Sequence, residues 1–268
     1  MSEAVIVDSG KIESGEDWKA LILKILIGML IVFLAAEFIF YLVVVPFTSR
    51  VRVTIEGMPD VGYDEICAMS GITGNEKWMN FNAAETAARL AANPLFEYVS
   101  VEKKFPDTVV INVKERTPVA VSLGMINGRT VPMEIDHAGV VFRIGQVHPD
   151  ENLPIITGLT FENPVAGMRL HPEFHSFLEN LKKIELHNPV LLSSISEIKI
   201  DEKTYGGYDL IIYPVHTPIR VRTDKTLNED SLQYMMLVLD VVKDMALNID
   251  EIDIRAGTVA YRVKGDLI

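Results

Sequence analysis

The sequence predicts an α+β protein in which a single transmembrane helix precedes a small β-α-α-β-β unit and a mostly antiparallel β region with two helices. Three observations indicate this class. One long apolar run lies near the start, the segment after it follows a strand-helix-helix-strand-strand order, and the second half contains more short alternating strands than helical stripes. Helices gathered on one face of a sheet are typical of the α+β class.

The apolar run at residues 20–47 is long enough to cross a bilayer. Residues 25–45 would form about 31 Å of helix, close to the thickness of the hydrocarbon core. About fifteen Leu, Ile, Val and Phe side chains, each contributing roughly 0.3 to 0.6 kcal/mol, outweigh one acid that costs about 3 kcal/mol at the bilayer centre. We therefore expect an uncleaved anchor. Its expected span residues include Leu21, Lys24, Gly28, Glu37 and Tyr41.

Two roles are open for Glu37 within this span. An intramembrane carboxylate can face a partner helix or can snorkel to the interface. Trp18 and Tyr41 have the amphipathic rings that are common at membrane interfaces, and between them Lys24 and Glu37 each lie within about two turns of an end. This placement favours snorkelling of both charges.

The charge distribution excludes one class of partner and leaves the orientation open. The chain carries 25 Lys and Arg against 37 Asp and Glu, a net charge of −12, whereas a nucleic-acid binder would show a basic face. Residues 1–19 form an acidic tail, and a cleaved signal peptide would begin with basic residues. Lys19 and Lys24 before the span balance Arg50 and Arg52 after it, so the positive-inside count is a tie.

The segment after the span has the signals of a strand, two helices and a hairpin. The expected strands are residues 51–57, 98–105 and 108–115, and the expected helices are residues 63–69 and 82–92. Gly71 should end the first helix. Asn82, with Glu85 three residues later, is typical of a capping box at the start of the second. Pro106-Asp107 suits the middle of a type I turn.

The second half alternates short strands with two amphipathic helices. The expected strands are residues 130–133, 140–142, 195–200, 208–213, 219–221, 251–255 and 258–263, and the expected helices are residues 172–186 and 226–245. Gly139 can take the positive φ that a turn before the second strand needs. Thr226 with Glu229 indicates a capping box. The predicted core stripes are Phe174, Leu178, Leu181 and Ile184 in the first helix and Leu232, Met235, Met236, Leu239 and Val242 in the second.

Few patterns in the sequence carry chemistry. His171 and His175 have a spacing that can bind zinc, but no third ligand is indicated and Glu173 is misplaced for the H-E-x-x-H arrangement. The sequence contains no G-x-S-x-G elbow, P-loop or dinucleotide fingerprint. We therefore expect a protein that is not an enzyme, with no catalytic, cofactor-binding or metal-binding residues.

Two smaller features are expected to have structural roles or to be exposed to solvent, and no specific function is assigned to them. Cys67, the single cysteine, is expected to be a small core residue on a helix. The basic pairs Lys103-Lys104 and Lys182-Lys183 are typical of solvated faces, with contact to lipid or glycan as the alternative.

Several short segments, in their order, resemble the POTRA domain of the FtsQ/DivIB family of bacterial cell-division proteins. They are residues 92–96, 99–101, 105–109 and 113–120, following one span and a short tail. The pattern Asp-x-x-Gly-x-Val-Phe at residues 136–142, followed by residues 153–158, resembles the opening of the FtsQ-type β domain. Residues 251–255 are similar to the family's Asp-Leu-Arg segment, although Ala256 stands where the family often has an aromatic.

This resemblance implies a domain order and a function. The implied domains are a short cytoplasmic tail (1–19), a transmembrane anchor (20–47), a POTRA domain (48–123), an FtsQ-type β domain (124–264) and a C-terminal tail (265–268). The implied protein is a non-enzymatic divisome scaffold at the division septum, single-pass in the cytoplasmic (inner) membrane with its N-terminus inside. It would act on no small-molecule substrate. Its implied partners are FtsB-like and FtsL-like proteins, which link to septal peptidoglycan synthesis, and further division proteins through the POTRA domain.

The resemblance also implies a binding site at the last strands. In that family the terminal strand lies at an open sheet edge and, with its neighbour, receives another division protein. Unpaired backbone N–H and C=O groups on an edge can be extended by a partner strand. The residues expected to bind are Ile254, Arg255, Thr258, Val259, Ala260, Tyr261, Arg262 and Val263. The alternatives are a membrane-anchored POTRA chaperone or secretion adaptor of the cell envelope and, behind it, an anchored hydrolase.

Overall fold

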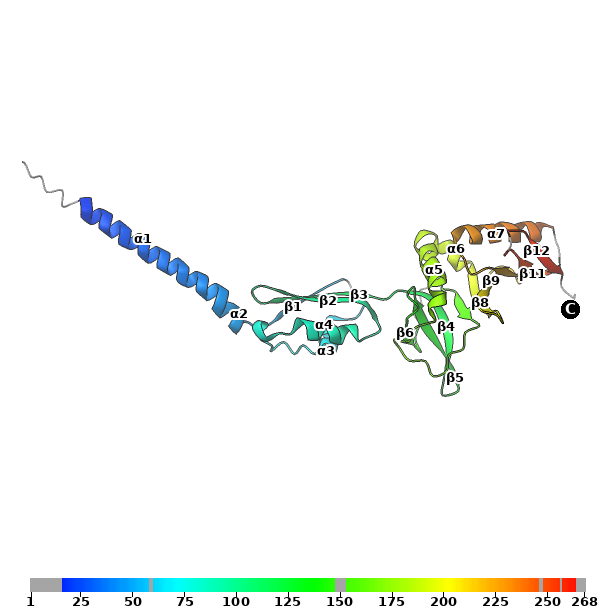
Figure 1. Ribbon diagram of the computed structural model, residues 1–268, viewed down its shortest axis with the longest axis horizontal. Helices are drawn as coiled ribbons and strands as arrows, with labels where there is room; N and C mark the ends of the chain where they lie inside the picture. The colour runs from blue at the N-terminus through cyan, green and yellow to red at the C-terminus, as the bar shows by residue number, and fades with distance from the viewer. Residues whose placement is uncertain (1–15, 58–59, 148–152, 246–247, 256, 264–268) are drawn as a thin grey trace, which may run out of the picture. The chain divides into compact units, whose positions relative to one another are not determined.

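The computed structural model describes residues 16–57, 60–147, 153–245, 248–255 and 257–263, and it confirms the α+β class (Figure 1). Most of the expected N-terminal tail, and all of the expected C-terminal tail, lie outside the described residues. The chain divides into two compact units. The first consists of residues up to 56 with residues 63–87 and 100–112, and the second consists of residues 57–62 and 88–99 with residues from 113 onward.

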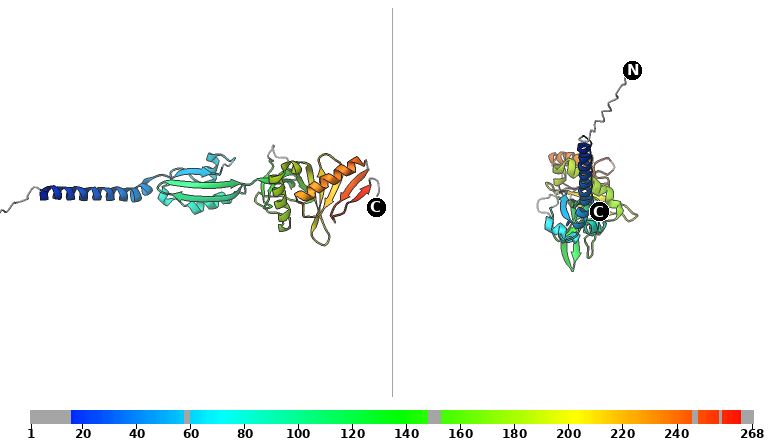
Figure 2. Two further views of the ribbon diagram at one scale, coloured as in Figure 1. Left: turned by 90° about the horizontal axis from the view of Figure 1, so that it is seen from above. Right: turned by 90° about the vertical axis from the view of Figure 1, so that its left-hand side faces the viewer.

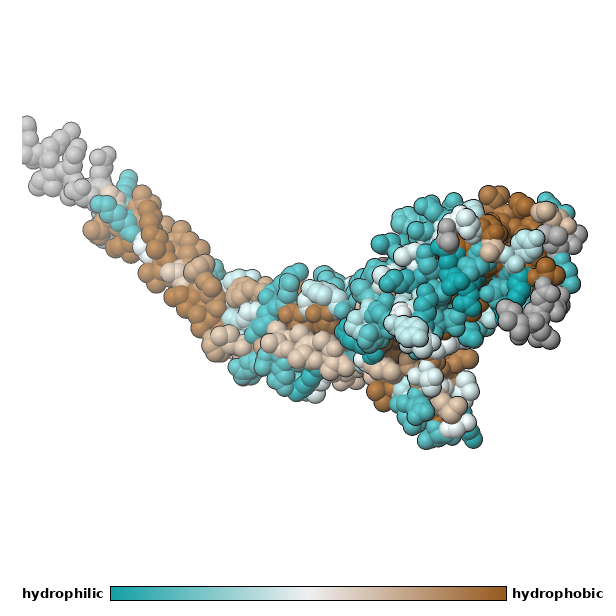
Figure 3. Space-filling view, turned by 45° about the vertical axis from the view of Figure 1, so that its right-hand side comes forward, coloured by the Kyte–Doolittle hydropathy of each residue, from teal (hydrophilic) through white to brown (hydrophobic). Residues whose placement is uncertain are grey.

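The predicted span lies in a helix that continues without a break from Glu16 to Thr48. It consists of α1 (Glu16–Ile39), the π-helical turn η1 (Phe40–Val44) and α2 (Val45–Thr48). Pro46 has no N–H to donate to the preceding turn, and its ring needs room there. The wide turn before it, closed by the Val45 N–H donating to the Phe40 carbonyl, accommodates the proline. Among the described residues this helix alone is long and apolar enough to cross a membrane, and beyond its first residues the surface that Figure 3 shows is mostly hydrophobic.

A three-stranded sheet follows in the order β1-β3-β2. Its strands are β1 (Arg52–Glu56), β2 (Phe96–Lys104) and β3 (Thr108–Glu115), and the helices between β1 and β2 in sequence are α3 (Tyr63–Ser70), the 3-10 turn η2 (Trp78–Asn80) and α4 (Ala83–Ala91). β1 pairs in parallel with β3, a pairing that requires the helical crossover. The predicted β-α-α-β-β order is confirmed, and each expected element has its ends within two residues of the prediction.

The helix ends follow the signals in the sequence. Gly71 has φ +76°. The N–H of Gly71 donates to the Ala68 carbonyl at 3.2 Å and that of Ile72 to the Cys67 carbonyl at 3.1 Å, which together form a Schellman motif. At the start of α4, the side-chain oxygen of Asn82 accepts the N–H of Glu85 at 3.2 Å, as predicted for the N-cap.

The second sheet has nine strands in the order β12-β11-β10-β9-β8-β7-β4-β5-β6. They are β4 (Pro118–Ile126), β5 (Arg129–Asp136), β6 (Val141–Ile144), β7 (Ile155–Thr157), β8 (Ile195–Glu202), β9 (Tyr208–Pro214), β10 (Arg220–Thr223), β11 (Ile249–Asp253) and β12 (Ala260–Val263). The pairs β4·β7, β7·β8 and β10·β11 are parallel, and the other five are antiparallel. β4 and β7 were not expected as strands. β4 includes the domain boundary expected between residues 123 and 124, which stays a prediction.

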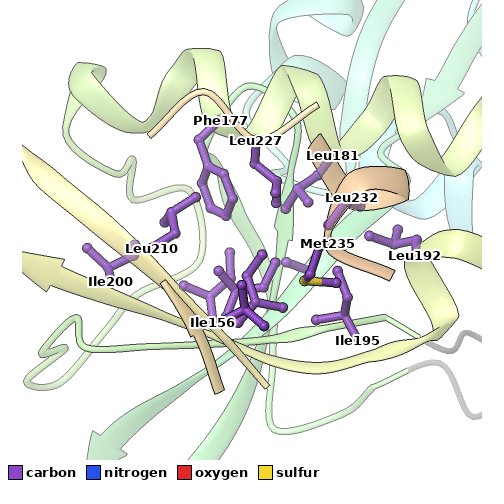
Figure 4. Close-up of a cluster of buried hydrophobic side chains, with 14 of the residues drawn as sticks. Ile156, Phe177, Leu181, Leu192, Ile195, Ile200, Leu210, Leu227, Leu232 and Met235 are labelled. Atoms are coloured by element: carbon purple, nitrogen blue, oxygen red, sulfur yellow. The ribbon is translucent and has the colours of Figure 1, made fainter. Parts of the chain in front are cut away.

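Helices cover one face of this sheet. They are the 3-10 turn η3 (Pro172–Phe174), α5 (His175–His187), the short α6 (Pro189–Ser193), which was not expected, and α7 (Glu229–Asp244). Figure 2 shows α7, in orange, lying along the last strands. The core lies between these helices and the sheet, where Phe177 and Leu181 of α5 and Leu232 and Met235 of α7 meet Ile156 and other buried strand residues (Figure 4).

The cap at the start of α7 differs from the prediction. Asn228, rather than Thr226, is the N-cap: its side chain accepts the N–H of Ser231 at 2.8 Å, and the Ser231 hydroxyl accepts the N–H of Asn228 at 2.9 Å. Thr226 instead donates its hydroxyl to Asp224. The spacing of three residues was right, but a serine can close the box as well as a glutamate, and the expected pair was two residues too early.

Candidate partner-binding edge

β12 forms one edge of the nine-stranded sheet. It pairs antiparallel with β11, so that Tyr261 lies opposite Ile252. No strand within the described residues pairs with its outer side. The outward-pointing backbone N–H and C=O groups of β12 can therefore accept a further strand.

The apolar side chains of β12 are exposed at this edge. Tyr261 is 58% exposed and Val263 is 43% exposed. Because side chains alternate along a strand, these two lie on the same sheet face, which is also the face of the buried Ile252 opposite Tyr261. Val259, directly before the strand, is 42% exposed. The edge therefore combines backbone groups that no described strand pairs with and an exposed apolar row.

The opposite face of the last strands carries a row of ion pairs. Arg262 of β12 lies 2.9 Å from Glu251 of β11. Glu251 also lies 2.6 Å from Arg220 and 3.2 Å from Arg222, both on β10. Arg222 in turn lies 2.6 Å from Asp201 of β8. Burial alone would lower the pKa of Arg220 and Arg222, but these carboxylates outweigh it and raise both pKa values. The row joins β12 electrostatically to the strands behind it.

The connection from β11 to β12 is held by four charged side chains, which we call the Asp209 cluster: Lys203, Asp209, Asp253 and Arg255. The Asp209 side chain is only 4% exposed, and its carboxylate lies 2.6 Å from Lys203 and 2.5 Å from Arg255. Arg255 also donates to Asp253 at 2.5 Å. The four side chains help to line a hollow of about 370 Å³.

The pKa values of the acids in the Asp209 cluster are lowered. Burial raises the pKa of Asp209, but hydrogen bonds from Lys203 and Arg255 outweigh it, so that the pKa lies below its ordinary value. The hydrogen bond from Arg255 lowers the pKa of Asp253. Both acids are therefore carboxylates at neutral pH, and the cluster stays charged.

The structure separates the eight residues that were expected to bind as edge strands. Ala260, Tyr261, Arg262 and Val263 form β12, whereas Ile254, Arg255, Thr258 and Val259 lie in the connection before it. Ile254 is 8% exposed and its N–H donates to the Arg222 carbonyl at 3.0 Å, so its side chain belongs to the core rather than to a contact surface. The guanidinium of Arg255 is engaged by Asp209 and Asp253.

Sequence reasoning missed the charges that support the edge. Arg220, Arg222 and Glu251 lie on strands that were expected, but Lys203 and Asp209 are far from them in sequence. The alternation Arg-Val-Arg on β10 and the acids of β11 indicated charged sheet faces, since alternate residues of a strand share a face. Their pairing depends on the parallel register of β10 and β11, which a single sequence does not give.

Other expected positions are found as follows. Leu21, Lys24, Gly28 and Glu37 lie on α1 and Tyr41 lies on η1, and all five residues are exposed. The two roles of Glu37 both stay predictions. Cys67 is half-buried on α3.

The structure gives no geometric support for a metal site in the part of the chain that it describes. No group of three or more His, Cys, Asp or Glu side chains there could hold a metal ion. His171 lies 3.1 Å from Glu173, an exposed pair at the start of a helix.

Comparison with known proteins finds one matching family model and two proteins of similar sequence. Residues 51–116 match the family model of the POTRA domain, FtsQ-type. Two relatives are each named cell division protein FtsQ. The one from Geobacter sp. (strain M21) is 31% identical over 112 residues, covering 41% of this chain and 38% of the relative. The one from Syntrophotalea carbinolica (strain DSM 2380 / NBRC 103641 / GraBd1) is 25% identical over 175 residues, covering 65% of this chain and 59% of the relative.

The fold and the edge define a class of protein: a POTRA module and an open-edged sheet that follow one apolar helix compatible with a membrane anchor. The matches together support the assignment of the chain to the FtsQ/DivIB family. In both relatives the matched part is less than two thirds of their length.

Proposed function

We propose that the chain is a non-enzymatic scaffold of bacterial cell division that holds FtsB-like and FtsL-like partners and links them to septal peptidoglycan synthesis at midcell. The observation that carries this proposal is the outer side of β12, with which no strand in the described parts of the chain pairs. The FtsQ-named relatives support the role in cell division.

The mechanism is strand addition. A partner segment would pair with the outer N–H and C=O groups of β12, and its alternate side chains would meet Tyr261 and Val263 on one face. The ion pair from Arg262 to Glu251 of β11, and the one from Glu251 to Arg220 of β10, hold the edge in place before binding. A pre-organised edge loses less conformational entropy when a partner binds, which favours affinity.

The remaining parts of the proposal concern location. The POTRA domain (48–123) would contribute to recruitment, and the apolar helix would keep the chain in the cytoplasmic membrane with its N-terminus inside. Binding free energy alone then brings partners to the septum, and no catalytic step is required.

The test measures the affinity of an FtsB-like peptide for the full chain in lipid nanodiscs. Replacing Tyr261 and Val263 by alanine should weaken binding by about tenfold or more, because exposed aromatic residues at interface centres dominate affinity. Deleting residues 257–268 should abolish it. Leu186→Ala, at a 69% exposed apolar residue on α5, is the matched control and should leave binding unchanged.

Unchanged affinity in both edge variants would refute strand addition at β12. If the chain instead bound unfolded outer-membrane strands and did not bind the peptide, the chaperone or secretion role would replace the scaffold.

A further inference from the structure

The end of the span is packed against residues that are distant in sequence. The ring of Tyr41, on η1, lies 5.3 Å from the ring of Phe105 at an interplanar angle of 73°. Phe105 follows β2, and its ring also lies 6.1 Å from that of Trp78 on η2. Pro46 of α2 is buried, whereas Val43 and Val44 before it are exposed. The turn after β2 therefore lies at the level where the helix leaves the lipid.

Backbone contacts join the residues directly after the helix to the segment that includes η2. The N–H of Trp78 donates to the Ser49 carbonyl at 3.1 Å, and the N–H of Val51 donates to the Glu76 carbonyl at 2.9 Å. Arg50 and Lys77 form an antiparallel bridge between these hydrogen bonds. The residues directly after the helix are therefore bonded to the segment that contains η2. This places η2 at the membrane end of the first unit as well.

This end of the first unit exposes both apolar and basic side chains, which we call the membrane-proximal tip. Its members are Phe47, Arg50, Lys77, Met79, Lys104 and Phe105. Phe47 is 51% exposed, Met79 is 47% exposed and Phe105 is 46% exposed. The three basic residues are also exposed.

A rigid platform supports the tip. The indole N–H of Trp78 donates to the Thr108 carbonyl at 3.0 Å. The ammonium of Lys103 lies 4.5 Å from the centre of the Trp78 ring and donates to the carbonyls of Met79 and Phe81, each at 3.2 Å. Two carboxylates lie nearby. Asp107 lies 3.7 Å from Arg52, and Oε1 of Glu76 accepts the N–H of Thr73 at 3.0 Å, whereas the buried Oε2 of Glu76 has no hydrogen-bond partner among the described residues.

We propose that the membrane-proximal tip is a binding surface for the headgroups of anionic phospholipids. Basic side chains beside a span are attracted to an anionic membrane surface, and exposed aromatic residues are favoured at the level of the headgroups. The tip has three exposed basic residues in a chain whose net charge is −12. An anionic membrane surface should therefore attract the tip and repel the acidic remainder of the chain. This surface goes beyond the scaffold function, and it depends only on the membrane anchor.

Trp78 can report this contact. The chain has two tryptophans, so the variant Trp18→Phe leaves Trp78 as the single fluorophore in the full chain. The protein is inserted into vesicles of phosphatidylcholine alone or with about one third phosphatidylglycerol, and Trp78 is quenched by lipids spin-labelled at the headgroup. Quenching should be at least about twofold stronger with phosphatidylglycerol and should fall towards the neutral-lipid value in about 0.5 M salt.

Charge reversal supplies the matched comparison. Lys77→Glu with Lys104→Glu should remove the dependence on phosphatidylglycerol. Lys199→Glu with Lys225→Glu, at exposed positions in the second unit, should leave it intact. Equal quenching in both vesicles, or the same loss in both double variants, would overturn the proposal. Flotation with the vesicles, measured first, reports on the anchor, so a failed anchor is distinguished from a failed lipid contact.

Discussion

Asp209 has an almost fully buried side chain that pairs with Arg255 in the connection between β11 and β12. Its carboxylate is paired with Lys203 and Arg255, so removing the charge takes away this ion pair from Lys203 and leaves Arg255 with Asp253 alone. We expect Asp209→Asn to lower the free energy of unfolding by about 1 to 3 kcal/mol at neutral pH. Urea unfolding of the detergent-solubilised chain measures this. Asp201→Asn is the control and should cost less than about 1 kcal/mol, because the Asp201 side chain is 41% exposed.

The same pairing makes the effect depend on pH. The folded pKa of Asp209 lies below its ordinary value, so its contribution to stability is complete above the unfolded pKa of about 3.9. It is lost as the pH falls through the folded pKa. The difference in stability between the natural chain and Asp209→Asn should therefore narrow below about pH 4. A difference that grows on acidification would contradict the assigned ion pairs.

At the scale of elements, the cap of α7 controls a helix whose buried residues form much of the core beneath the last strands. Asn228→Ala removes the side-chain acceptor for the Ser231 N–H and should destabilise the fold by about 1 kcal/mol. Thr226→Ala should cost clearly less, because Thr226 contacts only the nearby Asp224 in the hydrogen bonds described. The midpoint of urea unfolding, at unchanged m-value, measures both. A larger loss of stability in Thr226→Ala than in Asn228→Ala would instead support the capping box that was expected from the sequence.

The elements that the sequence predicted are those with strong local signals. Gly71 and Asn82 mark helix ends through their own backbone and side-chain hydrogen bonds, and both positions are confirmed. β4 and β7 were missed for different reasons. Asn127-Gly128, a two-residue hairpin turn in which both residues have positive φ, joins β4 to β5 and was a local signal that our prediction did not use. β7 is a strand of three residues with parallel neighbours on both sides, so its pairing cannot be read from the local sequence.

At the scale of the whole molecule, the sequence predicted the terminal hairpin that forms the sheet edge, but not which of its side chains are buried or engaged in ion pairs. The terminal hairpin was visible because residues 251–263 alternate around Gly257, which has φ +68°. The burial of Ile254 and the pairing of Arg255 with Asp209 depend on contacts between residues up to 46 positions apart. The sequence carries no local pattern for such contacts, so the core and cluster residues could not be separated from residues available to a partner.

The orientation of the chain in the membrane is a property of the whole molecule that a few charges can change. Lys19 and Lys24 before the span balance Arg50 and Arg52 after it. With the N-terminus inside, alkaline phosphatase fused after Ile268 should be active, because that enzyme folds only outside the cytoplasm. Since basic residues are retained on the cytoplasmic side, Lys19→Ala with Lys24→Ala should lower this activity by about twofold or more. Arg50→Ala with Arg52→Ala removes the same charge from the other side and should leave the activity at least as high. An inactive fusion to the natural chain would place the N-terminus outside and the candidate edge in the cytoplasm. A loss confined to the arginine variant would contradict the role given to Lys19 and Lys24 in setting the orientation.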